Sequence, residues 1–507
     1  MVMRARLDVA CRNWAGVLYG LAKVGVKCSD TAHVKRVFHI CMEQDLPGLL
    51  LEGQKCEPQS VSNVAIACVD AEYGGSMQPF ISAVAMRLGE PSMGGVGGRM
   101  MERAKPQEWS NLLYACAKLE QRGIRAGGGM GIITEVGAVA MAGALQKPVR
   151  DQPKPQELAN TLWGLSYFDW YDASIITVLA HAVVERMDGS IPQNISNTLL
   201  ALAKLEWYDE GAVSKLAAAM VECIDSSTPQ AISITLWALS TLGWYDPSVY
   251  DALLRALLDK SDQAVPQQLS NAIYSCAVAS HGGSAVDELA QGISRQDVGE
   301  GWKAQDVSNT LYAWAVLGSI GIVSDSLSTM AQHLMGEVNV RGPDAFQTLA
   351  LRQLYLAHLE AEQVGLPGGG LSNGMLQVAT EQHTQGQAEL RKKEKQSGGT
   401  AGVQQAAAAL QEAGYEVELG GWVGLQGDFF AELLVRHTGC GIAVDVLSGA
   451  DVFCHPTGQL SGKVRQRHTQ IRQRCDGLVV LSEGAVKQSG LVVQKVEEVI
   501  SGGTAAV

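Results

Sequence analysis

The sequence predicts a mainly α-helical protein, an α-solenoid of helix-pair repeats followed by a small α/β domain. The first observation is a phrase that begins at Pro155, Pro192 and Pro229 and each time leads to Trp-Tyr-Asp, a period of 37 residues. The second is helical spacing of the apolar residues inside each copy. The third is a change after residue 402 to short runs typical of strands. Self-similarity at 20 to 50 residues is the signature of stacked supersecondary units.

Each repeat is expected to contain two helices, A and B. Proline suits the first position of helix A, where its missing N–H would have no partner anyway, and Asp172 is a good N-cap for the helix B that follows. Spacings of 37–39 residues lengthen before Pro155 because of glycine-rich insertions at 94–98 and 127–131. We therefore expect roughly eight to nine units over 1–360. Their anchors are Cys11, Pro58, Pro106, Pro155, Pro192, Pro229, Pro266, Ala304 and Pro343.

The remainder of the chain is expected to be a flexible linker, 361–402, and a small α/β domain, 403–507. Glycine, glutamine and charge dominate the linker. In the domain we expect a helix, then strands, with a basic helix before the last strand. The ranges are 403–412 for the helix, 415–419, 431–436, 441–446 and 478–481 for the strands, and 463–474 for the basic helix.

Composition limits the class of protein. The net charge of −13 does not favour a nucleic-acid binder, and no apolar run is long enough to predict a membrane span. The 11 cysteines form no CxxC pair. Cys68, Cys116 and Cys276 share one repeat position, which predicts small core residues in a reducing compartment.

The two sides of helix A carry different residues. Counted from the anchor, positions +3, +7 and +10 are apolar and predict the packing face. Position +5 on the other side is Asn in six units, +2 is variable and mostly polar, and +9 is always small, leaving room for a flat ligand group. A constant and a variable polar residue on every unit suit a solenoid that reads a polymer. The candidate RNA-binding residues are Asn63, Asn111, Glu108, Glu157, Asn160, Asn194, Asn197, Gln268, Asn271, Asp306, Asn309, Lys118 and Lys204.

Two other interpretations of this side remain open. The repeated Asn also fits a hydrogen-bond ladder between helices. The aromatic residues at +8, such as Trp163 and Trp237, favour an inter-repeat core over base stacking, and the Trp-Tyr-Asp turns favour scaffolding.

The repeat, with its Pro-Gln start and Asn-Thr-Leu-Trp core, resembles the octotricopeptide repeat over roughly 11–360. The stretch about 430–490, with Ile442 to Val446, Phe453 to Pro456 and Cys475 to Ser482, resembles the RAP domain. The resemblance implies a factor that binds single-stranded organellar RNA and acts in its stability, processing, splicing or translation. It implies a chloroplast location, with the mitochondrion as the alternative, and base recognition on helix A.

The RAP resemblance also implies a fold like that of restriction endonucleases, whose carboxylates hold a metal ion. Asp445, with Glu432 or Asp428, fits the carboxylates, but Leu447 stands where such enzymes place Lys, and Lys463 is the substitute. We expect a non-catalytic protein with no cofactor and no bound metal. A basic run free of acids predicts further phosphate contacts, through Lys463, Arg465, Arg467, Arg472 and Arg474.

Two rival functions remain. One is a scaffold that binds proteins, which the acidic repeats favour, and the other is an RNA endonuclease guided by the solenoid. Other proteins of an RNA-processing complex are a second class of expected partner.

Overall fold

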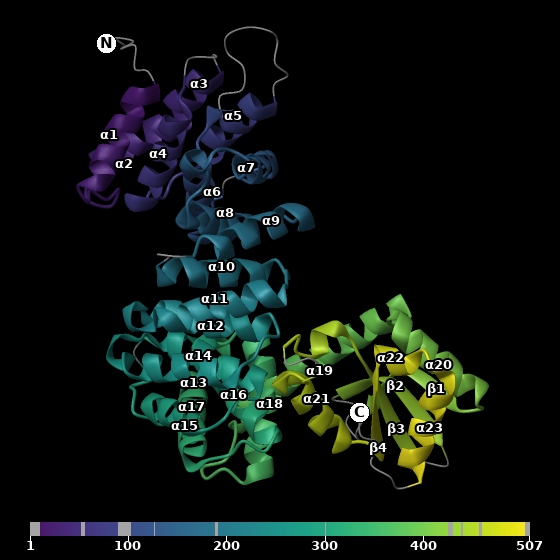
Figure 1. Ribbon diagram of the computed structural model, residues 1–507. Helices are drawn as coiled ribbons and strands as arrows, with labels where there is room; N and C mark the ends of the chain where they lie inside the picture. The colour runs from purple at the N-terminus through teal and green to yellow at the C-terminus, as the bar shows by residue number, and fades with distance from the viewer. Residues whose placement is uncertain are drawn as a thin grey trace. The chain divides into compact units, whose positions relative to one another are not determined.

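The computed structural model of the chain forms two compact units, Met1–Ser226 and Ser227–Val507, and each is described by itself. Both contain helical hairpins, and the second also contains a four-stranded sheet (Figure 1). The described residues are 11–51, 56–89, 103–125, 127–187, 191–299, 301–423, 429–437, 440–455 and 459–501.

In the first unit, each A helix packs against the next A helix along the chain. The A helices are α1 (Cys11–Lys23), α4 (Pro58–Asp70), α6 (Pro106–Gln121), α8 (Pro155–Tyr167) and α10 (Pro192–Lys204). The helices between and after them are α2 (Ala32–Ile40), η1 (Cys41–Asp45), α3 (Leu46–Leu51), α5 (Gln78–Gly89), α7 (Met130–Ala144), η3 (Val149–Asp151), α9 (Ala173–Glu185), α11 (Glu210–Glu222) and η4 (Ile224–Ser226).

The second unit continues the same pattern and then changes. Its A helices are α12 (Pro229–Thr241), α14 (Pro266–Ala279), α16 (Ala304–Ser319) and α18 (Thr348–Val364). They alternate with α13 (Pro247–Leu258), η5 (Ser261–Gln263), α15 (Ser284–Ser294), α17 (Asp325–Arg341) and η6 (Pro343–Ala345). The long helix α19 (Asn373–Ser397) leads to the C-terminal domain.

Local sequence explains these helices. Proline occupies the first turn of α4, α6, α8, α10, α12 and α14, as predicted. The Asp of each Trp-Tyr-Asp accepts a backbone N–H from helix B, at Asp172, Asp209 and Asp246. The predicted packing face is confirmed, because Leu158, Leu162 and their counterparts at +3, +7 and +10 are buried.

Two expectations about the end of the array differ from the structure. The anchor Pro343 begins only the short turn η6, and the last A helix starts at Thr348. The expected flexible linker at 361–402 is mostly α19. Its Gln, Glu, Ala and Lys residues are good helix formers, Gln377 and Gln385 donate to Glu four residues later, and Met375, Ala379 and His383 are buried.

The C-terminal domain has the predicted α/β order. It comprises α20 (Ala401–Glu412), β1 (Glu416–Val423), β2 (Phe429–His437), β3 (Cys440–Leu447), η7 (Gly449–Asp451), α21 (Gly462–Arg472), β4 (Gly477–Ser482), α22 (Glu483–Val486) and α23 (Ser489–Ile500). The strand order is β1-β2-β3-β4; the first two pairs are antiparallel and β3 runs parallel to β4.

The two faces of this sheet carry different kinds of residue. Leu433, Val435 and Val444 point to one face and form the core with α20 and α23. Because side chains alternate along a strand, Glu432 and Asp445 point to the opposite face, where α21 and α19 lie. The fold therefore separates an apolar core face from a face that carries the titratable groups.

Two sequence expectations about the rest of the chain can be compared with the described residues. None of the described helices is long and apolar enough to cross a bilayer. Cys68, Cys116 and Cys276 are free and buried, so the repeat cysteines are core residues as expected.

Candidate nucleic-acid interface

The exposed side of helix A is a stripe formed by positions +1, +5, +8 and +12. At 100° per residue these positions fall within about 60° of one another. In α6 they are Gln107, Asn111, Tyr114 and Lys118, of which the first is exposed and the others half-buried. The sequence interpretation grouped +2, +5, +9 and +12. The structure keeps +5 and +12 on this side, but the more exposed positions beside them are +1 and +8, in place of +2 and +9. The signal for the correct stripe was Gln at +1, present in every unit from Pro58 to Ala304.

The Asn side chains at +5 are available for a ligand. Asn63, Asn111, Asn160, Asn197 and Asn271 are half-buried, and among the described residues their side-chain amides have no hydrogen-bond partner. Asn309 differs, because its Oδ1 accepts from Gln305 Nε2 at 2.7 Å and from Gln353 Nε2 at 2.9 Å. No ladder of Asn side chains links the described helices, so the ladder interpretation of this position is not supported.

Aromatic rings at +8 contact one another between neighbouring repeats. In the first unit the ring centroids of Tyr114 and Trp163 lie 5.3 Å apart, and Tyr167 at +12 lies 5.9 Å from Trp163. Lys118 Nζ lies 4.8 Å from the Trp163 ring centroid, and burial lowers the pKa of Lys118. Lys204 Nζ lies 5.6 Å from the ring of Tyr167. Trp163 itself is buried, whereas Tyr114 and Tyr167 are half-buried, so part of this row of rings is exposed.

The variable residue at +2 has a structural role in four units. Glu157 Oε2 accepts the backbone N–H of Lys154 at 2.8 Å, which caps the start of α8. Burial raises the pKa of Glu157, so this carboxyl is partly withdrawn from water. Asn194 is buried and has no such bond among the described residues. The capping residues at +2 are Glu108, Glu157, Gln268 and Asp306.

The small residue at +9 leaves no room for a ligand, contrary to expectation. A Cβ on Gly164 would lie 3.0 Å from Cβ of Leu113 in the preceding A helix. The corresponding Ala115 and Ala201 are fully buried. Position +9 is small because neighbouring A helices approach closely there.

In the second unit the C-terminal domain contacts this stripe. Tyr274 and Tyr312, both at +8, have ring centroids 6.2 Å apart. Lys463, at the start of α21, places Nζ 5.0 Å from the Tyr274 ring centroid. A Cβ on Gly462 would overlap the carbonyl oxygen of Ala277, so only glycine permits α21 to lie this close to α14.

His455 and the residues from Gln459 to Gln473 contact the C-terminal ends of successive A helices. Backbone N–H groups of Tyr245 and His455 donate to His455 O at 2.7 Å and Gly243 O at 3.0 Å, which forms a short parallel bridge after α12. Side chains then donate to otherwise unused carbonyls at helix ends, as such carbonyls require. Gln459 Nε2 bonds Ala279 O, and Thr469 Oγ1 bonds Ser319 O.

The predicted basic run is divided among three places. Lys463 and Arg467 line a cavity of about 610 Å³, Arg465 and Arg472 line a separate hollow of about 270 Å³, and Arg474 lines a cleft of about 970 Å³. These five basic residues therefore do not line one common cavity. An α-helix spreads residues at i, i+2 and i+4 around its circumference.

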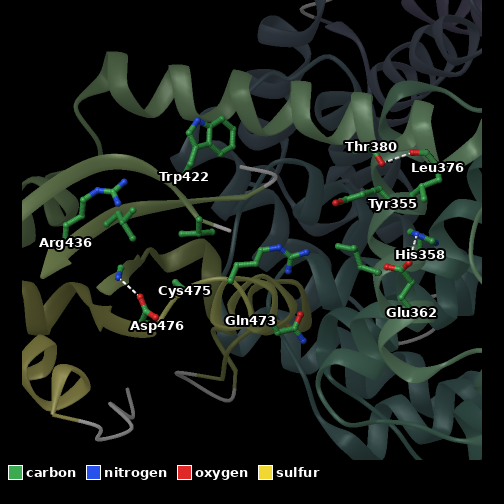
Figure 2. Close-up of a pocket in the computed structure, with 15 residues that line it drawn as sticks. Tyr355, His358, Glu362, Leu376, Thr380, Trp422, Arg436, Gln473, Cys475 and Asp476 are labelled. Carbon is green, nitrogen blue, oxygen red and sulfur yellow. Dashed lines mark hydrogen bonds and ion pairs between the residues drawn. The ribbon is translucent and has the colours of Figure 1, made fainter. Parts of the chain in front are cut away.

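A cleft of about 970 Å³ lies between the sheet and α18 (Figure 2). Trp422 and Arg436 come from the sheet, whereas Tyr355, His358 and Glu362 come from α18. Asp476 accepts the backbone N–H of Gly441 at 2.6 Å, and His358 Nε2 lies 3.5 Å from Glu362 Oε1. Its charged groups are of both signs, so the cleft itself does not indicate one class of ligand.

The carboxylates considered for a nuclease do meet, but Asp445 is already paired. His468 Nε2 lies 2.7 Å from Asp445 Oδ2, and Arg467 forms an ion pair with the same oxygen. Burial acts to raise the pKa of Asp445, but these two partners outweigh it and lower the pKa. Burial, then the charge of Asp445, raises the pKa of Glu432 to about 7. Among the described residues no cluster of three or more His, Cys, Asp or Glu is arranged to hold a metal ion, and Asp428 lies outside them.

Comparison with models of known protein families gives no match for this chain, and comparison with curated proteins gives none either. The chemistry of the helix A stripe and of the C-terminal domain therefore carries the functional argument.

Proposed function

We propose that the protein binds single-stranded RNA along the +1, +5, +8 and +12 stripe of its A helices and selects for sequence. The observation that carries the proposal is the set of half-buried Asn amides with no partner in the described structure, beside a row of aromatic rings. An amide offers both donor and acceptor to a base edge. Proteins bind unpaired RNA by combining such contacts with aromatic stacking.

The stripe also has cations for the phosphate backbone, although the chain is acidic overall. Lys118 of α6 and Lys204 of α10 both lie beside aromatic rings of α8, the A helix between them. Few phosphate contacts mean that affinity comes mainly from stacking and amide bonds, and that its salt dependence is shallow. The resemblance to octotricopeptide-repeat proteins supports this function, and an action on transcripts of the chloroplast, or of the mitochondrion, is part of the proposal.

A selection from a random RNA library with the intact chain tests this function. We expect a preferred sequence, and we expect Asn160→Ala together with Asn197→Ala to weaken its binding about tenfold or more, which corresponds to the loss of one or two base contacts. If no sequence is enriched, or if a protein partner binds the stripe and RNA does not, the proposal fails in favour of a protein-binding scaffold.

A matched pair of lysines gives the control. Lys204 belongs to the stripe of α10, whereas the exposed Lys215 lies on the B helix α11. Lys204→Gln should weaken RNA binding and reduce the salt slope by about 0.7. Lys215→Gln removes the same charge and should change neither.

A further inference from the structure

The cavity of about 610 Å³ lies where the stripe of the second unit meets the C-terminal domain. One wall is Tyr312, the +8 residue of α16, and the opposite wall is the first half of α21. The neighbouring stripe residue, Tyr274, is already in contact with Lys463. A strand that follows the stripe past α14 and α16 therefore reaches this cavity and is obstructed beyond it by α21.

Two buried donors that line this cavity have no acceptor among the described residues. Gln466 is 3% exposed, and its Nε2 has no partner among the described residues. The Nε of Arg467 is likewise buried without an acceptor. Leaving a buried N–H unpaired costs about 1–3 kcal/mol, so two such groups on one wall indicate an acceptor-rich ligand.

The start of α21 adds to this positive character. The backbone N–H groups of a first helical turn and the helix dipole favour an anion. Lys463 stands in this first turn and Ser461 caps it, its Oγ accepting from Val464 N–H at 3.4 Å. Lys463 and Ser461 both line the cavity.

The acids of the cavity are mostly satisfied internally. Asp445 is paired with Arg467 and His468, and Asp451 accepts both the N–H and the hydroxyl of Ser448. Glu432 accepts the N–H of Val446 at 2.9 Å, and its pKa of about 7 reduces its negative charge near neutral pH. Glu394 Oε1 is buried with no donor among the described residues, which suits a ribose hydroxyl.

We propose that this cavity binds the phosphorylated terminal nucleotide of an RNA strand. The phosphate bonds Lys463, Gln466 and the start of α21, the base lies against Tyr312 and the rings of Phe429 and Phe430, and a ribose hydroxyl donates to Glu394. A volume of about 610 Å³ is sufficient for one nucleotide. This proposal deepens the proposed RNA-binding function and rests on it for the source of the nucleotide.

The test compares one oligoribonucleotide in three forms, with a 5′-phosphate, with a 3′-phosphate, or with hydroxyls at both ends, on the intact chain. We expect one phosphorylated form to bind about tenfold tighter than the hydroxyl form. Lys463→Gln, at an exposed position, should abolish that preference, so that the phosphorylated forms bind no tighter than the hydroxyl form. Arg465→Gln, on the same helix but outside this cavity, should keep the preference. Equal affinity for all three forms with the unmodified protein overturns the proposal.

A second arm separates this site from the RNA stripe. Adenosine monophosphate, inorganic phosphate and adenosine are titrated in turn into the intact chain and into the Lys463→Gln and Gln466→Met variants. We expect the monophosphate to bind to the intact chain, adenosine to bind more weakly, and both variants to lose the difference. If the nucleotides bind in this way but no RNA binds, the proposed RNA-binding stripe is refuted and the cavity remains a site for a free nucleotide. Equal binding of adenosine and the monophosphate would refute the phosphate site, whatever the RNA result.

Discussion

His455 stacks on Trp244 in the third Trp-Tyr-Asp turn, with ring centroids 5.5 Å apart and an interplanar angle of 17°. The first two copies of this turn have Asp169 and Glu206 before the Trp, both at positive φ, whereas the third copy has Gly243 at φ +68°. A Cβ on Gly243 would lie 3.2 Å from the backbone N of Cys454. The third of these turns therefore has no side chain at position 243, where the C-terminal domain contacts it.

Gly243→Ala should loosen this docking. The new methyl group meets Cys454 and also occupies a backbone conformation that non-glycine residues adopt at a cost, so we expect a loss of about 1–3 kcal/mol. Urea unfolding of the intact chain, followed by tryptophan fluorescence, measures it. Gly292→Ala in α15 is the control, because nothing lies within 4 Å of its Cβ and helix propensity predicts a gain of up to about 1 kcal/mol. Equal effects of the two substitutions would contradict the docking role of Gly243.

Alanine substitutions of the Asn residues at +5 should fall into two groups by their effect on the free energy of unfolding. Asn160 has no partner among the described residues, so Asn160→Ala should change the free energy of unfolding by less than about 0.5 kcal/mol. Asn309 accepts two hydrogen bonds, so Asn309→Ala should cost about 1–2 kcal/mol. Thermal melts of both variants check this difference. A large destabilisation by Asn160→Ala would show that the stripe amides are structural and would weaken the case for RNA contact.

The residue at +2 should behave as a helix cap. Glu157→Ala removes the acceptor of the Lys154 N–H, and we expect a loss of about 1 kcal/mol. Glu157→Gln keeps an acceptor of the same shape and should retain most of the stability. The same pair is then tested for RNA preference. A Glu157→Gln protein that selects a different RNA sequence would restore the original interpretation of +2 as a recognition position.

The sequence was sufficient to predict the elements that a repeat period or an alternation of apolar and polar residues encodes. The period set the A helices from Pro58 to Ala304, and the strand runs set β1 to β4. The sequence alone did not predict correctly which positions of helix A are exposed, because this depends on the rotation of each helix about its axis and on the helices packed against it. A small residue at +9 in every copy fits either a ligand or a close neighbouring helix. The structure decides for the helix, because a Cβ on Gly164 would lie only 3.0 Å from Leu113 Cβ.

The C-terminal site was the least predictable part, because its residues come from distant segments. Asp445 and Lys463 were identified as a pair, and the structure places both at one cavity. Their environment was not predictable, since the pairing of Asp445 with His468 requires the tertiary approach of α21 to β3. The glycine-rich composition at the start of 361–402 likewise concealed α19, whose buried His383 packs against the rings of Tyr355 and Phe429.

Glu360 should make the stability of the protein depend on pH. It lies in α18, is 1% exposed, and its Oε2 has no partner among the described residues; burial raises its pKa to about 7. The folded state therefore holds a proton that the unfolded state releases near pH 4.5, so stability falls as pH rises from about 4.5 to about 7. A shift of this size corresponds to roughly 3 kcal/mol. Glu432 adds a slope of the same sign.

Glu360→Gln cannot ionise, so it should be more stable than the unmodified protein above pH 7 and about equal to it near pH 4.5. Melting temperatures at pH 5 and pH 8 measure this pH dependence. The difference in melting temperature between the two pH values should be smaller in Glu360→Gln than in the unmodified protein, but it should not vanish, because Glu432 remains. Glu412→Gln in α20, at an exposed position with no ion pair among the described residues, is the control and should leave this difference unchanged. An unchanged difference in Glu360→Gln would contradict this prediction, because it would mean that the pKa of the Glu360 carboxyl is nearly the same in the folded and unfolded states.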